Sequence, residues 1–191
     1  MIALGNDVID LAETPRNGLR YYRRLQSYAF SAQELEQFRL NRNLPEQLAI
    51  GWSVKEAAYK SVTKLIGRKQ TVPKSFHFEV ISETPNFLTS SVRFEDFILQ
   101  AETSLTDFHV HSLCYLVRPR AGLVVGIGTT QPDYKNQSSD VRTLALQAMT
   151  NADRIRKSVD GVPYFERGGK PLATELSLSH HGRWVAFAYQ S

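Results

Sequence analysis

Trp52-Ser53-Val54-Lys55-Glu56-Ala57-Ala58-Tyr59-Lys60 is the stretch that decides the fold. It lies in a run of good helix formers between Pro45, which is tolerated in the first turn of a helix, and Gly67, which suits a left-handed cap. On this predicted helix the tryptophan, the glutamate and the final lysine are four residues apart, so they share one face. A Glu–Lys pair at this spacing is commonly a surface ion pair worth about 0.3–0.5 kcal/mol. Whether this helix face is functional therefore has to be judged from other segments of the chain.

The composition predicts a globular protein with a hydrophobic core. The chain has 191 residues, of which 42% are hydrophobic and 22% charged, enough for one domain or two small lobes. Its net charge of +4 favours acidic or phosphate-bearing partners, and the lack of a long basic run speaks against nucleic acid. Cys114 is the only cysteine, so neither an intrachain disulfide nor a cysteine zinc site is expected. The sequence shows no signal-peptide pattern and no apolar run of about 18–20 residues, so we expect a cytoplasmic protein that does not span a membrane.

Hydrophobic periodicity predicts an α+β fold. A strand is expected from Ile2 to about Asp7 or Val8, and a helix follows the capping box that begins at Ser31. The later elements are expected to be strands near 76–80, 91–100, 108–117 and 123–128, a polar linker over 131–139, a helix from Ser139 or Asp140, and a strand–turn–strand unit over 176–189. We therefore expect helices packed on antiparallel sheets.

Charged residues near the N-terminus have two interpretations each. Asp7 and Asp10 follow a short apolar strand, where acids commonly form turns or helix caps. A basic segment with Tyr21 and Tyr22 comes next, and its arginines are Arg16, Arg20, Arg23 and Arg24. This segment is either a solvated helix face or a docking surface for an acidic protein.

Three segments together resemble the phosphopantetheinyl transferase family. They are Gly5-Asn6-Asp7-Val8-Ile9-Asp10, Trp52-Ser53-Val54-Lys55-Glu56-Ala57 and Ser177-Leu178-Ser179-His180-His181-Gly182. They are similar to the family's Gly-x-Asp strand end, its Trp-x-x-Lys-Glu-(Ala/Ser)-x-x-Lys helix and its Ser-x-Ser-His turn. Each motif alone is weak, but their combination is specific, and their order is that of the holo-acyl-carrier-protein synthase group.

The resemblance implies a fold of two pseudo-symmetric lobes with antiparallel sheets packed by helices. Residues 1–133 would form the larger lobe, with the Asp7 strand and the Lys-Glu helix, and residues 139–191 the smaller lobe with the Ser-His turn. This order implies a permuted pseudo-dimer with its site between the lobes. A single lobe with a long insertion that assembles as a homo-oligomer is the alternative.

The reaction implied by the resemblance transfers the 4'-phosphopantetheine arm of coenzyme A to a serine of a carrier protein and releases adenosine 3',5'-bisphosphate. Mg2+ would be held by Asp7 and Glu56, with Asp10 as a third ligand, because this cation prefers oxygen ligands beside phosphates. Lys60 would either stabilise charge on the transferred phosphate or remove the serine proton, and Glu56 acting through water is the alternative base.

Contacts to coenzyme A are implied for Lys55, Lys60, Ser179 and His180. The family's Gly-(Lys/Arg)-Pro turn, which grips the nucleotide, has two candidate matches here, Gly161-Val162-Pro163 and Gly169-Lys170-Pro171, and Arg154 or Arg156 could replace it. Carrier proteins are acidic, so the resemblance favours the docking interpretation of the arginine-rich segment.

Two other functions compete with this one. The basic charge would also suit a module that binds an acidic protein or nucleic acid, and the carboxylates would suit a magnesium-dependent nucleotide hydrolase. The sequence leaves open the oligomeric state and the carrier, which belongs to fatty acid, polyketide, peptide or another lipid biosynthesis.

Overall fold

The computed structural model describes residues 3–13, 18–38, 40, 42–67, 72–117, 122–131 and 133–190. In chain order the elements are β1 (Gly5–Asp10), α1 (Gly18–Ala29), α2 (Ala32–Glu36), α3 (Leu44–Ile66), β2 (His77–Glu83), β3 (Phe87–Phe94), β4 (Phe97–Leu105), β5 (His109–Tyr115), β6 (Leu123–Thr129), α4 (Tyr134–Ala148), β7 (Arg154–Lys157), β8 (Pro163–Arg167), β9 (Lys170–Pro171), β10 (Glu175–His181) and β11 (Trp184–Gln190). Within these residues no helix is long and apolar enough to cross a membrane.

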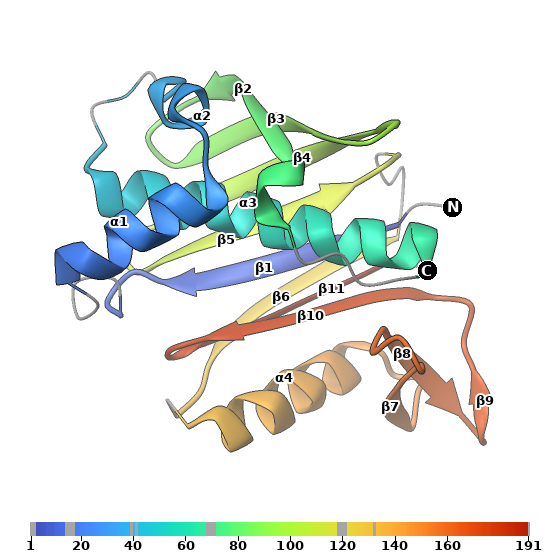
Figure 1. Ribbon diagram of the computed structural model, residues 1–191. Helices are drawn as coiled ribbons and strands as arrows, with labels where there is room; N and C mark the ends of the chain where they lie inside the picture. Colours follow the sequence, from blue (N-terminus) through green and yellow to red (C-terminus); the bar gives the residue numbers. More distant parts are fainter. Residues whose placement is uncertain are drawn as a thin grey trace.

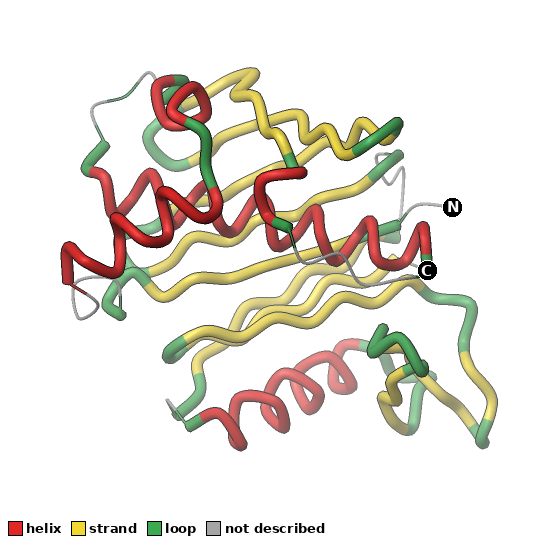
Figure 2. Tube along the Cα trace, in the orientation of Figure 1, coloured by secondary structure: helices red, strands yellow, loops and turns green. Residues whose placement is uncertain are grey.

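The strands form three antiparallel sheets. The largest has the order β1-β5-β4-β3-β2, a second has the order β10-β11-β6, and a small one has the order β7-β8-β9. Helix α3 lies across the first sheet and α4 lies along the second, on the side away from the first sheet (Figures 1 and 2). The expected α+β fold with helices on antiparallel sheets is therefore confirmed, while the pseudo-symmetry of two lobes stays a prediction.

Local sequence explains the ends of α3. The Asn43 side chain caps its first turn by accepting a hydrogen bond from the backbone N–H of Glu46, and Pro45 lies in that turn. At the other end Gly67 adopts a left-handed conformation (φ 64°), and its N–H donates to Thr63 O. Between the caps the helix packs a continuous apolar face on the five-stranded sheet, and Val54, Ala57, Ala58 and Val62 of that face are completely buried.

β1 approaches α3 unusually closely at Gly5. A Cβ atom on Gly5 would overlap the carbonyl oxygen of Ala57 and lie 2.8 Å from Ser61 Oγ. Only a glycine allows the strand to pack here, because the neighbouring atoms belong to the helix backbone and cannot turn away. The glycine of the Gly-x-Asp motif thus brings Asp7, two residues later, next to α3.

Replacement of Gly5 by alanine tests this close approach. Gly5→Ala should lower the free energy of unfolding by about 1–3 kcal/mol, the usual cost of overpacking, and urea denaturation would measure it. Gly128→Ala is the matched control, because its Cβ would meet the flexible end of Leu144 at 3.2 Å and Val185 Cγ2 at an ordinary contact distance of 3.7 Å. Equal losses in the two variants would show that the contact at Gly5 is not special.

The second sheet meets the first along β1 and β10 without a backbone ladder. Side chains of β10 take its place: the Asn6 N–H donates to Ser177 Oγ at 2.9 Å, and the Asp10 N–H donates to His181 Nδ1 at 3.1 Å. A small apolar cluster that includes Leu4, Tyr115 and Ala188 fills the space beside this junction. We call these contacts between β1 and β10 the seam.

Three expectations about the elements differ from the structure. The stretch 91–100 is not one strand, since Glu95 and Asp96 form a tight turn between β3 and β4, with Glu95 at a positive φ of 49°. α4 begins at Tyr134, so most of the expected linker over 131–139 is helical. β6 was placed in the larger lobe, but it pairs with β11 along its whole length. The division into two lobes stays a prediction, and strand pairing would move its boundary to the connection between β5 and β6.

Candidate active site

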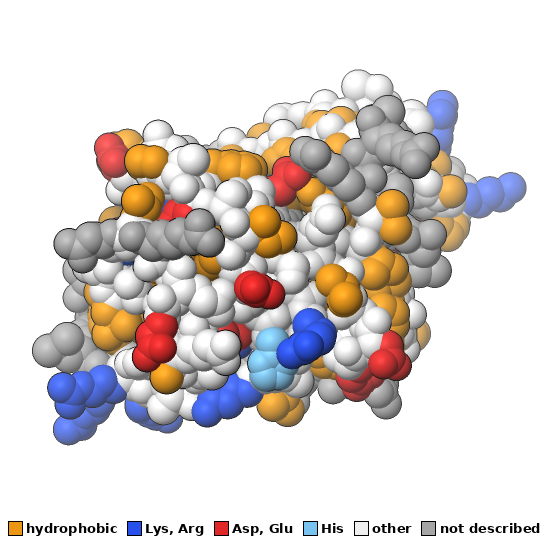
Figure 3. Space-filling view, turned by 90° about the horizontal axis from the view of Figure 1, so that it is seen from above, with side chains coloured by type: hydrophobic (Ala, Val, Ile, Leu, Met, Phe, Trp, Pro, Cys, Tyr) orange, Lys and Arg blue, Asp and Glu red, His pale blue; other side chains and the backbone are white. Residues whose placement is uncertain are grey.

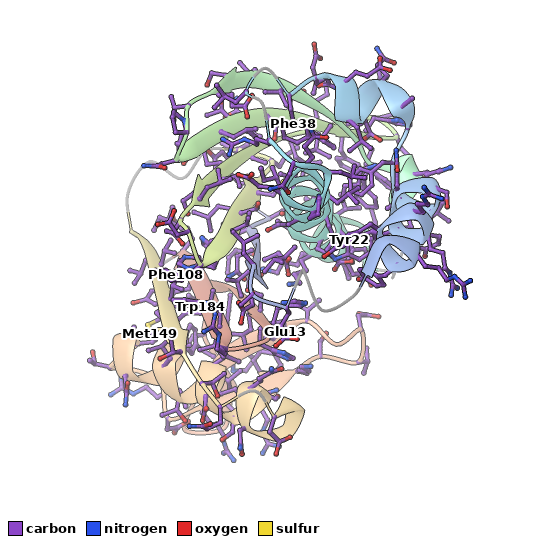
Figure 4. The ribbon with its side chains drawn as sticks, turned by 90° about the vertical axis from the view of Figure 1, so that its left-hand side faces the viewer. Glu13, Tyr22, Phe38, Phe108, Met149 and Trp184 are labelled. Atoms are coloured by element: carbon purple, nitrogen blue, oxygen red, sulfur yellow. The ribbon has the colours of Figure 1, made fainter. Side chains whose placement is uncertain are left out.

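The face of α3 predicted from the four-residue spacing lines a cavity. Trp52, Glu56 and Lys60 border a space of about 420 Å³, and Asp7 of β1 and His180 of β10 border it from the other side. The rest of the wall is largely apolar, and α1 and the first half of α3 contribute Tyr21, Tyr22, Leu25, Pro45, Leu48 and Ala49 to it. In Figure 4 the Tyr22 side chain lies between these two helices. Three distant segments of the chain therefore meet in one site.

Asp7 and Lys60 form an ion pair inside this cavity. Lys60 Nζ donates to Asp7 Oδ1 and to the carbonyl oxygen of Asn6, both at 2.9 Å. Burial raises the pKa of the Asp7 carboxyl above its usual range, and the ammonium of Lys60 opposes that rise. An ionised Asp7 in this place therefore needs a positive charge beside it.

Glu56 is the second carboxylate of the cavity. Burial raises its pKa first, the negative charge of Asp7 raises it further, and Lys60 lowers it. Two carboxylates in one cavity, one of which hinders the ionisation of the other, form a site that favours a cation. Mg2+ fits this pair, since it takes one or two carboxylates and completes its shell with water and substrate phosphates. Among the described residues no three His, Cys, Asp or Glu side chains lie close enough to form a metal cage by themselves.

The raised pKa of Glu56 gives a prediction for stability. The folded protein holds the Glu56 proton more tightly than the unfolded chain, so stability is lost as pH rises through the folded-state pKa. Without divalent cations Glu56→Gln should therefore melt at a higher temperature than the parent at about pH 7, and the difference should vanish below about pH 4. Calorimetry at the two pH values checks this.

Glu79→Gln is the control for that measurement, because Glu79 is exposed on β2. The control should leave the melting temperature unchanged at both pH values. If Glu56→Gln melted below the parent at about pH 7, the raised pKa of Glu56 in the folded protein would be refuted.

A second cavity, of about 210 Å³, adjoins the first. Lys60, Leu178 and His180 line both spaces. The walls of the second are rich in cations, namely Lys64, Arg142 and Lys157, and include the turn Gly161-Val162-Pro163. Burial lowers the pKa of Lys64 to about 8, although Glu175 opposes this, so the Lys64 ammonium is still largely charged at neutral pH. A pair of acids on one side and a group of cations on the other is suited to a ligand with several phosphates and a bound cation.

Comparison with known proteins fits this arrangement. A model of the 4'-phosphopantetheinyl transferase superfamily matches residues 3–116, which is more than half of the chain. The chain belongs to this family. Among curated proteins, none matches it significantly. The matched part carries Asp7, Glu56 and Lys60, whereas His180 and the second cavity's arginine lie outside it.

Lys55, a predicted contact to coenzyme A, lines neither of the two cavities. Its side chain is 2% exposed and points away from the first cavity's acids, with Nζ donating to Ala29 O at 2.6 Å and to Glu34 Oε2 at 3.0 Å. The ammonium also lies 5.0 Å from the centre of the Phe30 ring. Lys55 is one residue from Glu56, so the helix turns it to a different face, where it ties α3 to α1 and α2.

Loss of Lys55 should therefore affect stability and not substrate binding. Lys55→Met leaves Glu34 buried without its partner, and we expect a loss of about 3–5 kcal/mol in the free energy of unfolding. At a temperature where the variant is folded, its KM for coenzyme A should be that of the parent. A KM raised about tenfold or more would contradict a purely structural role.

Asp10, the expected third metal ligand, does not reach the cavity. Its carboxylate accepts hydrogen bonds from the backbone N–H, Nε and one terminal nitrogen of Arg183, at 2.9–3.1 Å, and from the N–H of Ala12. These contacts lower its pKa, although burial alone would raise it. A Cβ on Gly182 (φ 57°) would lie 2.5 Å from Asp10 Oδ2, so the turn between β10 and β11 closes directly over the carboxylate. Asp10 fastens this turn to β1 instead of holding a cation.

The residues predicted to bind the nucleotide lie in different places in the structure. Of the two candidate turns, Gly161-Val162-Pro163 lines the second cavity, while Lys170 is exposed on β9 and lines neither cavity. Arg154 and Arg156 point to Glu166 of β8 and line neither cavity as well. The arrangement thus favours the first turn, with cations supplied by other residues.

Ser179 and His180 both border the first cavity, but their environments differ. Ser179 Oγ accepts a hydrogen bond from Asn6 Nδ2 at 3.1 Å and contacts Ala186 O at 3.4 Å, so it belongs to the seam. Burial lowers the pKa of His180, and the charge of Lys60 lowers it further. His180 lines both cavities and so stands where a bridging diphosphate would lie.

The arginine-rich segment forms α1, and its arginines are exposed. These are Arg20, Arg23 and Arg24, while Arg16 lies outside the described residues. Lys and Arg side chains gather at the corner of the molecule where α1 lies (Figure 3). Because Tyr21, Tyr22 and Leu25 of the same helix line the first cavity, this basic surface borders the site.

Sequence reasoning missed three cations of the second cavity. Lys64 lies four residues after Lys60, so the spacing that joined Glu56 to Lys60 could have extended to it. Arg142 and Lys157 come from α4 and β7, and only the folded chain brings them near α3. No local pattern in the sequence marks these two.

Proposed function

We propose that this phosphopantetheinyl transferase is of the holo-acyl-carrier-protein synthase type, with Mg2+ as its cation. It moves the 4'-phosphopantetheine arm of coenzyme A to a serine of an acyl or peptidyl carrier protein. The observation that carries the proposal is the junction of an acidic and a basic cavity at Lys60 and His180. Members of the family use coenzyme A and typically a divalent metal.

The two cavities suggest how coenzyme A would bind. The adenosine bisphosphate end suits the second cavity, where Lys64, Arg142 and Lys157 supply positive charge. The diphosphate would then lie beside Lys60 and His180, and the arm would extend along the apolar wall made by α1 and α3. In this arrangement the cations of the second cavity face the nucleotide phosphates, and the largely apolar wall of the first cavity faces the arm.

Different residues of the chain would hold the cation, stabilise the developing charge and accept the serine proton. Mg2+ held by Asp7 and Glu56 would neutralise the diphosphate. The serine hydroxyl forms a bond to the phosphorus that carries the arm, and the bond from that phosphorus to the bridging oxygen breaks, so adenosine 3',5'-bisphosphate leaves. Lys60 already donates hydrogen bonds to two acceptors as an ammonium, which favours a role in stabilising charge. Glu56, whose side chain lines the same cavity, is then the candidate acceptor for the serine proton through water.

The carrier protein would dock on α1. Carrier proteins are acidic, and the three exposed arginines of α1 lie at the edge of the cavity that holds the acids. Tyr21, which is 47% exposed on the same helix, adds an apolar contact surface. A cytoplasmic location and action as a monomeric pseudo-dimer or a homo-oligomer complete the proposal.

Mass spectrometry of an apo-carrier protein tests this function. Incubation with the protein, coenzyme A and Mg2+ should add one phosphopantetheine arm to the carrier serine, and adenosine bisphosphate should be released in equal amount. Asp7→Asn and Glu56→Gln should each lower the rate by about 100-fold or more, since each removes a carboxylate that would hold the Mg2+ at the diphosphate. Glu79→Gln, a change of the same type on an exposed strand face, should keep the parent's rate.

Two results would contradict the proposal. One is the absence of transfer to a panel of acyl, polyketide and peptidyl carrier proteins. The other is cleavage of coenzyme A at the same rate with and without a carrier, which would indicate a nucleotide hydrolase.

A further inference from the structure

Asn6 is completely buried and makes contacts to three other elements. Its N–H donates to Ser177 Oγ at 2.9 Å, and its carbonyl oxygen accepts from Lys60 Nζ at 2.9 Å. Its side-chain Nδ2 donates to Ser179 Oγ at 3.1 Å and lies 3.4 Å from His111 Nε2. One residue therefore connects β1 to β10, α3 and β5, directly before Asp7.

These contacts matter because β1 and β10 belong to different sheets. No backbone ladder joins the two strands, so side chains of the seam set their relative position. Asp7 is carried by β1, whereas His180 is carried by β10, next to Ser179. Both must act on the same diphosphate, so a shift between the strands would separate the groups that hold it.

An asparagine suits this position better than other residue types. Its amide offers two hydrogens, and the two acceptors beside it are Ser179 Oγ and His111 Nε2. Burial lowers the pKa of His111 to about 4, so the ring is neutral at pH 7 and its Nε2 can accept. The amide oxygen, by contrast, has no partner in the described structure. A buried acceptor without a partner reduces stability, so stability alone does not explain why an amide stands here.

We propose that Asn6 is a positioning residue of the transfer reaction, which fixes the Asp7 strand against the His180 strand without touching the substrate. This inference rests on the proposed function, since it assigns Asp7 and His180 to the diphosphate. Phosphoryl transfer depends mainly on positioning and charge stabilisation, so a small displacement of either group slows it strongly.

Steady-state kinetics of Asn6→Ala and Asn6→Asp test the role. Aspartate has the same shape but lacks both amide hydrogens. Each variant should lower kcat by about 10- to 100-fold while the KM for the carrier protein changes less than about threefold. Gln37→Ala is the control, because it removes two hydrogen bonds to the backbone of Phe78 and Val80 on β2, which lies at the edge of the first sheet opposite β1. The control should lower the melting temperature and leave kcat within about twofold of the parent.

A spectroscopic measurement follows the same contact independently of catalysis. With Asn6 as donor, His111 must carry its proton on Nδ1, whereas the carboxylate of Asn6→Asp favours a proton on Nε2. Nitrogen-15 NMR of the histidine ring should show this change of tautomer in the variant at pH 7. An unchanged tautomer would show that the Asn6 amide does not donate to His111, so the amide would not have the orientation that also directs it to Ser179, and the inference would be overturned.

The kinetic outcomes separate the two proposals. If the parent transfers the arm and both Asn6 variants keep kcat within about twofold of Gln37→Ala, the positioning role is wrong and the function stands. The role is also wrong if the variants raise the KM for coenzyme A about tenfold with kcat unchanged, since Asn6 would then contact substrate. If the parent does not transfer the arm at all, both proposals fail.

Discussion

The site depends on how closely β1 packs on α3. Gly5 has no Cβ, and this lets the strand lie against the backbone of Ala57. Asp7 is thereby placed in an ion pair with Lys60, and close enough to Glu56 for its negative charge to raise the pKa of the Glu56 carboxyl. A methyl group at position 5 would push the strand away and separate these charges. The contact between Gly5 and α3 therefore both packs the core and positions the charged side chains of the site.

The other side of β1 is held by polar contacts. Ser177 and His181 of β10 accept hydrogen bonds from its backbone, and Arg183 after β10 is fastened to Asp10. These bonds come from side chains and not from a backbone ladder, so β1 and β10 stay in separate sheets. His180 belongs to the second sheet and still lines the first cavity. The result is an acidic and a basic cavity that share Lys60, Leu178 and His180. A substrate in which a diphosphate joins a phosphorylated nucleoside to a long flexible arm would suit this arrangement.

Sequence patterns correctly predicted the features that depend on interactions between residues close together in the chain. The capping box at Ser31, the left-handed Gly67 and the shared face of Trp52, Glu56 and Lys60 all follow from interactions within a few residues, and the structure has them. Even the resemblance to a family rested on such short patterns. The start of α4 was misplaced because its first turn is made of polar residues that are typical of a linker.

The predicted site differs from the structure where the direction of a side chain, or a contact between distant segments of the chain, determines which residues line the cavities. Residues 7 and 10 are three apart in a strand, so they face opposite sides, and this parity could have excluded Asp10 as a ligand beside Asp7. Lys55 is one residue from Glu56 on a helix and so lies about 100° around its axis, toward Glu34. Arg142 and Lys157 could not be found, because their approach to Lys60 depends on how the second sheet sits on the first.

A crystal structure with coenzyme A and Mn2+, a substitute for Mg2+, tests the central claim most directly, since anomalous scattering locates the manganese. The account predicts one manganese ion between the carboxylates of Asp7 and Glu56, bound to the diphosphate, with the His180 imidazole against the same diphosphate and the nucleotide among Lys64, Arg142 and Lys157. Manganese at another place, or coenzyme A bound away from these two cavities, would contradict it.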